Sequence, residues 1–191
     1  MRKLCLWVSL VVLGWSSGAS AVPIQWTVAE GGNGHWYDTV GQGYGGSNES
    51  YLWGEARVDA EIRGGYLATM TSASEWSFMQ SSFASIVGDG SRMGWLGAYQ
   101  TNPSGPNLDS WTWITGEPWI FTDWHGGEPN GGGGENHLVV WFHEGSGWND
   151  VWDGPFRYYI EYDTNPIPEP STALLLGLGL AGMAAGRRRI R

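Results

Sequence analysis

Cysteine is almost absent from this 191-residue sequence, and the one cysteine, Cys5, lies near the N-terminus. Residues 1–21 begin with Arg2 and Lys3, continue with an apolar run and end in Ala19-Ser20-Ala21. This pattern is typical of a cleaved secretory signal peptide, and the apolar run is too short to span a bilayer. The exported chain is therefore expected to have no disulfide, so its stability must come from packing or from a bound metal.

Basic residues are also scarce. Between Val22 and Pro168 there are 4 arginines and no lysine against 18 acidic residues, a formal net charge of −14. Such a surface repels nucleic acid and anionic lipid, and it suits the binding of a cation. Solubility outside the cell explains most of the acidic excess. The roughly 145 residues of this span make one ordinary domain.

The sequence has no apolar run long enough for an ordinary membrane span. Ser171 to Gly186 is a 16-residue run without charge, which as a helix would rise about 24 Å, short of the roughly 30 Å hydrocarbon core. Pro168-Glu169-Pro170 precedes the run, and four arginines follow it. Residues 164–191 resemble the PEP-CTERM sorting signal of Gram-negative bacteria, although a weak membrane anchor is an alternative. The resemblance implies processing by an exosortase, membrane contact through the tail before processing, and a link to exopolysaccharide.

Helical and strand periods alternate along the remaining chain. Residues 49–63 have helical spacing that ends at Gly64-Gly65, and the Ser72–Glu75 segment has the sequence of a capping box before a second helix that includes Trp76, Met79, Phe83 and Ile86. Residues 22–46 suggest a short strand and a loop. Further strands are expected at 66–70, 95–99, 111–114, 138–143 and 157–162. This order predicts an α+β domain with an antiparallel sheet.

Oxygen donors gather in the segment from Glu128 to Asp150, which reads EPNGGGGENHLVVWFHEGSGWND. Its glycines exclude a regular helix at the start, and no cysteine is near. Five side chains offer oxygen: the carboxylates of Glu128, Glu135 and Asp150 and the amides of Asn130 and Asn149.

Several phrases, in order, resemble C-type lectin-like domains. They are Gly64-Gly65-Tyr66-Leu67-Ala68-Thr69, Trp95-Leu96-Gly97, Trp111-Thr112-Trp113 through Phe121-Thr122-Asp123-Trp124, Glu128-Pro129-Asn130, Gly134-Glu135-Asn136 and Trp148-Asn149-Asp150. The resemblance implies a domain at 22–163 with two helices, short antiparallel sheets and a long calcium-binding loop. The sequence departs from this family by having no disulfides, and His137 stands where a cysteine is usual.

The resemblance also implies the ligands. Glu128, Asn130, Glu135, Asn149 and Asp150 would bind one Ca²⁺, a hard cation that takes about 6 to 8 oxygen ligands. Zinc and magnesium suit this donor set less well. Glu128 with Asn130, and Glu135 with Asn149, would also bind two neighbouring sugar hydroxyls. In the family, Glu-Pro-Asn goes with mannose-type sugars (mannose, glucose, N-acetylglucosamine and fucose) and Gln-Pro-Asp with galactose. The Glu128–Pro129 peptide bond is expected to be cis.

Histidines and aromatic side chains near this segment need separate interpretations. His137 and His143 share strand parity, but about 20 Å would separate them along a strand, so a shared zinc ion is not expected. His125 is interpreted as a loop residue. Trp124 and Trp148 are predicted to lie in the core. Trp141 and Trp152 are open candidates for stacking on a pyranose ring, and the exposure of Trp119 and Phe121 is open.

The sequence thus predicts an exported, calcium-dependent sugar-binding module on the cell surface or in the extracellular matrix of a Gram-negative bacterium. Its partners would be carbohydrate or exopolysaccharide and the exosortase, and not nucleic acid. The alternative is a lectin-like module that binds a protein partner without sugar recognition. An enzyme is not expected, because carboxylates that bind calcium are poor proton donors.

Overall fold

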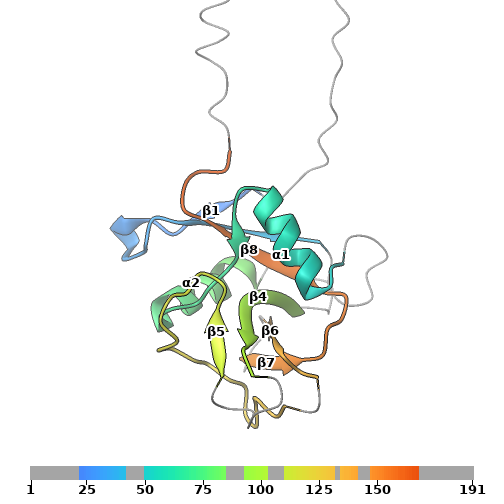
Figure 1. Ribbon diagram of the computed structural model, residues 1–191. Coiled ribbons are helices and arrows are strands. Elements are labelled where there is room, and N and C mark those ends of the chain that lie inside the picture. Colours follow the sequence, from blue (N-terminus) through green and yellow to red (C-terminus); the bar gives the residue numbers. More distant parts are fainter. Residues whose placement is uncertain are drawn as a thin grey trace, which may run out of the picture.

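The computed structural model describes residues 22–41, 50–84, 93–102, 110–131, 134–141 and 147–167 (Figure 1). The predicted signal peptide and the tail from 168 onward lie outside these ranges, as do Ile86 and His143. The elements in chain order are β1 (Ile24–Gln25), the 3₁₀ helix η1 (Val28–Glu30), β2 (Trp36–Val40), α1 (Trp53–Ile62), β3 (Tyr66–Leu67), α2 (Ala73–Phe83), β4 (Met93–Gln100), β5 (Trp111–Trp113), β6 (His137–Trp141), β7 (Trp148–Val151) and β8 (Arg157–Tyr162).

One sheet joins all the described strands, in the order β1-β2-β8-β4-β6-β7, with β3 on β8 and β5 on β4. This confirms the predicted α+β class. The prediction of a purely antiparallel sheet is wrong in one pair, because β4 and β8 run parallel, with Gly94 opposite Arg157 and Trp95 opposite Tyr158. Sequence periodicity does not report this pairing, since the two strands are about 60 residues apart in the chain.

Helix α1 begins where two carboxylates accept backbone hydrogen bonds. Glu55 Oε2 accepts from the Leu52 amide at 3.0 Å, and Asp153 Oδ1 accepts from the Trp53 amide at 2.8 Å. These bonds satisfy donors that a helix N-terminus leaves without an intrahelical partner. The helix ends before Gly64, whose φ of 84° favours glycine. The predicted helix at 49–63 is thus confirmed, with a later start.

Helix α2 has only half of the predicted capping box. Ser72 Oγ accepts from the Glu75 amide at 3.2 Å, as expected. The Glu75 carboxylate, however, accepts from the Thr71 amide at 2.7 Å and from the Tyr37 hydroxyl at 2.6 Å. Glu75 is buried, so its contact with β2 replaces the local capping contact.

A second buried carboxylate, Glu161 of β8, connects segments that lie far apart in the sequence. It lies 2.7 Å from His35 Nδ1 and accepts from the Thr69 amide at 3.0 Å and from the Tyr37 hydroxyl at 3.2 Å. The contact with Glu161 raises the pKa of His35. Since buried charges are tolerated when they are hydrogen-bonded, these bonds fix strands β2 and β8 to the segment before α2.

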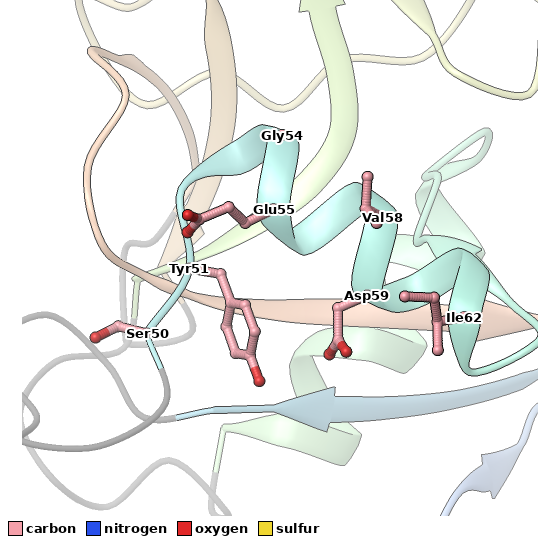
Figure 2. Close-up of a pocket in the computed structure, with 7 residues that line it drawn as sticks. All are labelled: Ser50, Tyr51, Gly54, Glu55, Val58, Asp59 and Ile62. Atoms are coloured by element: carbon pink, nitrogen blue, oxygen red, sulfur yellow. The ribbon is translucent and has the colours of Figure 1, made fainter.

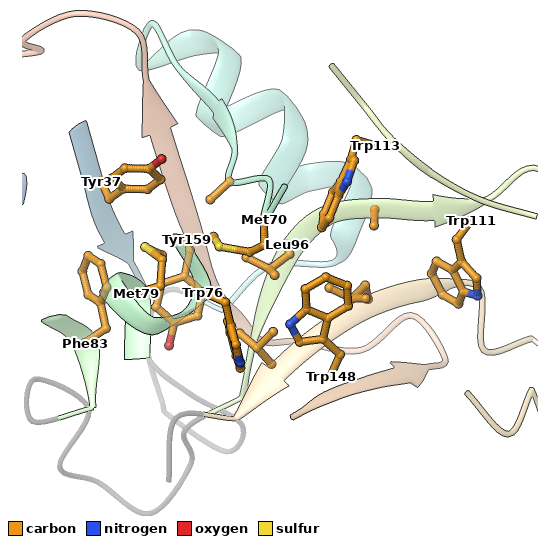
Figure 3. Packing of buried hydrophobic residues seen from close by; sticks show 14 of the residues in the cluster. Tyr37, Met70, Trp76, Met79, Phe83, Leu96, Trp111, Trp113, Trp148 and Tyr159 are labelled. Atoms are coloured by element: carbon orange, nitrogen blue, oxygen red, sulfur yellow. The ribbon is translucent and has the colours of Figure 1, made fainter. Parts of the chain in front are cut away.

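Tryptophan fills much of the core. One buried cluster contains Trp76, Trp113 and Trp148 together with Phe83 and Tyr159, and Figure 3 shows these rings packed beside β4 and α2. A second cluster contains Trp53 and Trp95 with residues from β6, β7 and β8. A fully buried ring of 150–250 Å² stabilises by about 4–6 kcal/mol at 25 cal/mol per Å². Ring burial therefore supplies stability in a domain without disulfides.

The long connection between β5 and β6 lies at the lower end of the molecule with β5, β6 and β7 (Figure 1). Helix α1 and the end of the described chain after β8 lie at the upper end. Within the described ranges, no helix has the length and apolar character needed to cross a membrane.

Candidate functional site

The oxygen-rich segment spans the end of the long connection and the β6–β7 hairpin. In the hairpin, Asn149 lies opposite Val139 and Asp150 lies opposite Leu138. The hairpin is anchored in the sheet because β6 also pairs with β4. Asn149 and Asp150 are thus held on a regular strand, whereas the segment that carries Glu128 and Asn130 depends on tertiary contacts for its position.

The long connection is bound to β7 by backbone hydrogen bonds. The Trp148 amide donates to Asp123 O at 2.7 Å, and the His125 amide donates to Trp148 O at 2.9 Å. A side chain at Gly147 would not fit, because a Cβ there would lie 2.7 Å from Asp123 O and 2.7 Å from His125 N. The Trp76 indole N–H also donates to Asp123 Oδ2. Asp123 therefore positions the connection, a role that no local sequence pattern indicates.

The peptide bond between Glu128 and Pro129 is cis, which confirms the prediction. The Glu128 amide donates to His125 O at 2.9 Å. The backbone N–H of Asn130 donates to Glu128 Oε2 at 3.1 Å. The Glu128 carboxylate and the Asn130 backbone are therefore neighbours.

Asp150 connects the strand to this turn. Its Oδ1 accepts from the backbone N–H of Asn130 at 3.0 Å, and its Oδ2 accepts from the backbone N–H of Gly131 at 2.8 Å. Asp150 is 1% exposed, so both hydrogen bonds are shielded from water and are stronger for it. Residues 19 and 20 positions apart in the sequence are thus brought together at one carboxylate.

Two neighbouring carboxylates act on Glu128. Loss of hydration raises the pKa of Glu128, and the neighbouring Asp150 and the charge of Glu135 raise it further. Negative charge close to a carboxylate disfavours its ionisation, and a bound cation would reverse that effect.

The side-chain amide of Asn149 tests whether these residues suit a bound cation. Its Oδ1 is buried and accepts no hydrogen bond from the described residues. Buried acceptors are rarely left unpaired, and each one costs about 1–3 kcal/mol. A cation bound at Asn149 Oδ1 would satisfy this oxygen, and carboxylate and amide oxygens are ligands that suit calcium.

The five predicted residues are not all shown in mutual contact. Hydrogen bonds join Glu128, Asn130 and Asp150, electrostatics link Glu135 to Glu128, and Asn149 is the chain neighbour of Asp150. Within the described part of the chain, no group of three or more His, Cys, Asp or Glu side chains is arranged to hold a metal ion. The predicted set has three carboxylates, and its remaining side-chain ligands are amide oxygens.

One family model and two relatives are similar to parts of this chain. A family model described as the PEP-CTERM protein-sorting motif matches residues 166–189. Halomucin of Haloquadratum walsbyi is 30% identical over 149 residues, which cover 68% of this chain and 1% of halomucin. Ladderlectin of Oncorhynchus mykiss is 32% identical over 100 residues, which cover 52% of this chain and 50% of ladderlectin. The chain thus spans half or less of the length of these two relatives.

Solved structures decide the fold. The C-type lectin domain of murine dendritic cell inhibitory receptor 2, solved in complex with an N-glycan, is 23% identical with a TM-score of 0.54 over 68% of this chain and 91% of that chain. Human lithostathine is 15% identical with a TM-score of 0.60 over 77% and 92%. Herring type II antifreeze protein is 16% identical with a TM-score of 0.52 over 66% and 89%.

The protein has the C-type lectin-like fold and carries a PEP-CTERM sorting motif. These structural identities are all below 25%, and the same fold occurs in an antifreeze protein. They therefore describe the scaffold, and the function has to be argued from the residues of this chain.

Aromatic side chains of this C-type lectin-like domain pack around Trp148, the residue before Asn149. Trp148 is fully buried, with ring centroids 5.7 Å from Trp113 and 5.8 Å from Trp124. Trp119 and Phe121 are partly buried and pack against the same cluster. The core placement predicted for Trp148 is confirmed, and Trp124 packs at the edge of the core. Trp152 is 53% exposed, and the side chain of Trp141 lies outside the described part.

His137 is partly buried and packs against two tryptophans. Its ring stacks on Trp53 at 4.5 Å and lies edge-on to Trp95 at 6.0 Å. Burial lowers the pKa of His137. Trp53 is also the residue whose amide donates to Asp153. His137 and Asp153 thus attach the base of the β6–β7 hairpin to the start of α1 without a disulfide.

A cavity of about 500 Å³ lies elsewhere, along α1, where Figure 2 shows Tyr51, Val58, Asp59 and Ile62 among its lining residues. None of the five predicted ligands lines it. Val58 and Ile62 are exposed, so this surface is apolar and separate from the candidate calcium site.

Proposed function

We propose that this domain binds one calcium ion through Glu128, Asn130, Glu135, Asn149 and Asp150, and that it binds carbohydrate through that ion. The observation that carries the proposal is the Asn149 Oδ1 atom, which is buried and has no hydrogen-bond partner among the described residues, in the residue next to the buried Asp150. The cluster of like charges around Glu128 supports it independently. A bound calcium ion would supply a Lewis acid to which the oxygens of two neighbouring sugar hydroxyls would donate electron pairs.

The residues of this chain would orient those hydroxyls. A carboxylate accepts a hydrogen bond from a hydroxyl, and an amide N–H donates one to it. Glu128 with Asn130, and Glu135 with Asn149, provide these two pairs. The Glu-Pro-Asn order in this chain favours mannose-type sugars, namely mannose, glucose, N-acetylglucosamine or fucose.

The sorting motif indicates export with surface or extracellular sorting in bacteria and processing by an exosortase. We infer a Gram-negative host and a location on the cell surface or in the exopolysaccharide matrix, with a signal peptide at 1–21, the domain at 22–163 and the tail at 164–191. The described chain ends opposite the candidate site in Figure 1.

Titration calorimetry with the full chain tests this function. In calcium the protein should bind mannose and not galactose, and in EDTA it should bind neither. The double substitution Glu128→Gln with Asn130→Asp should shift the preference toward galactose. The matched control Glu30→Gln removes an exposed carboxylate of η1 and should change nothing. Equal binding of mannose with and without calcium would refute the proposal.

A protein partner is the second candidate, favoured by the apolar surface of α1 around Val58 and Ile62. Such binding would survive EDTA and would be lost when Val58 and Ile62 are both replaced by serine. Catalysis is not proposed, because the carboxylates of the site would be committed to calcium.

A further inference from the structure

We propose that the sugar site continues from the calcium ion onto Trp152, which would stack on a second pyranose of an uncharged oligosaccharide. This inference rests on the proposed function and names its ligand more closely. Trp152 directly follows β7, two residues after Asp150 and three after Asn149. At about 3.3 Å per residue, its backbone lies within about 10 Å of both.

Trp152 differs from the other tryptophans of the domain. Among those whose side chains the structure describes, it is the only one that is more than half exposed, at 53%, whereas Trp148 four residues earlier is fully buried. Its indole N–H makes no hydrogen bond with the described residues. A large apolar ring with one free donor, next to a polar site, suits a ligand that has an apolar face and hydroxyl groups.

The ring is held in place. A Cβ at Gly154 would lie 3.0 Å from Trp152 Cζ3 and 3.2 Å from Phe156 Cε2. The indole therefore lies against the backbone of Gly154, where a Cβ would push the ring by a few tenths of an ångström. Phe156 packs edge-on to Trp95 at 4.8 Å, which connects this platform to the core. A fixed ring loses little conformational freedom when a ligand stacks on it.

Charge selects an uncharged ligand. Between Met93 and Phe156 the sequence has no lysine or arginine and eight acidic residues. This span contains every predicted ligand and Trp152. A uronic acid or a sulfated sugar stacked on Trp152 would meet only negative side chains from this span. Mannose-type oligosaccharides without charge avoid that repulsion.

Calorimetry in calcium tests the subsite with two ligands, methyl mannoside and a linear mannotriose. The wild-type full chain should bind mannotriose about fivefold more tightly than methyl mannoside, because one stacked ring adds roughly that factor. Trp152→Ala should reduce the ratio to about one and leave the affinity for methyl mannoside unchanged. Trp152→Phe should keep most of the ratio. Ile120→Ala, a control at an exposed apolar side chain of the long connection, should keep all of it.

The outcomes separate the two ideas. If wild type binds neither ligand in calcium, the proposed function fails and the subsite fails with it. If wild type binds both ligands and Trp152→Ala keeps the wild-type ratio, the subsite alone is overturned. A fall in melting temperature for Trp152→Ala without a change in the ratio would assign the ring to covering Gly154. A trisaccharide of uronic acid that binds as tightly as mannotriose would overturn the preference for uncharged sugars.

Discussion

Replacing Asn149 with alanine should have opposite effects with and without calcium. The Asn149 Oδ1 atom is buried and unpaired among the described residues, and such an acceptor costs about 1–3 kcal/mol. Alanine removes that cost and loses some packing. In a chelator, the free energy of unfolding should therefore fall by less than about 1 kcal/mol, or rise.

In calcium the same substitution should destabilise the domain. A ligand at 100 times its Kd stabilises the folded state by about 2.7 kcal/mol. Loss of one ligand oxygen that weakens calcium binding tenfold would remove about 1.4 kcal/mol of this gain. For a domain of this size the melting temperature should fall by roughly 3–8 °C.

Thermal unfolding followed by circular dichroism, in EDTA and in a calcium series, measures both effects. Asn165→Ala is the matched control, because Asn165 is exposed and its side chain makes only a local bond to the Ile167 amide. If Asn149→Ala lowers the melting temperature equally in both conditions, Asn149 has a packing role and the reasoning is refuted. A wild-type melting temperature that does not respond to calcium would refute the metal site itself.

Three further predictions concern the scaffold. Trp148→Ala should lower the free energy of unfolding in urea by about 3–5 kcal/mol, because the ring is fully buried. Gly147→Ala should weaken calcium binding measured by calorimetry, because its Cβ would push the long connection off β7. Asp38→Asn should stabilise the domain above about pH 6 and should have little effect at pH 4, because burial raises the pKa of Asp38 to about 6.

The sign of the Asp38 effect follows from proton linkage. The pKa of Asp38 is above its ordinary value, so the folded state holds the proton more tightly than the unfolded state does. Its contribution is favourable at low pH and is lost as the pH rises through the folded pKa, a change of about 3 kcal/mol for two pKa units. A wild-type stability that rises between pH 4 and pH 7, with no difference from Asp38→Asn, would contradict this.

For Gly147→Ala, unchanged calcium affinity would contradict the prediction. For Trp148→Ala, a loss of unfolding free energy below about 1 kcal/mol would contradict it.

The helices could be predicted because their signals are local. The turn at Gly64-Gly65 ends α1, and Ser72 caps α2, each within a few residues of the bonds it makes. Strand β7 was not predicted, since Trp148-Asn149-Asp150-Val151 has no clear alternation and owes its conformation to pairing with β6. Glu75 shows the same limit, because its carboxylate binds a hydroxyl 38 residues away as well as the nearby Thr71 amide.

The sequence by itself determined the chemistry of the candidate site: five oxygen donors, an excess of negative charge, no disulfide and a sorting motif at the C-terminus. Residue type and spacing are enough for these conclusions. Only the tertiary structure decided that Asp150 binds the backbone of Asn130, that Asn149 Oδ1 is unpaired, and that Trp148 is buried while Trp152 is exposed. The physical reason is that burial and pairing depend on contacts between segments that are distant in the sequence. Two residues of the same type, such as Trp148 and Trp152, make different contacts of this kind.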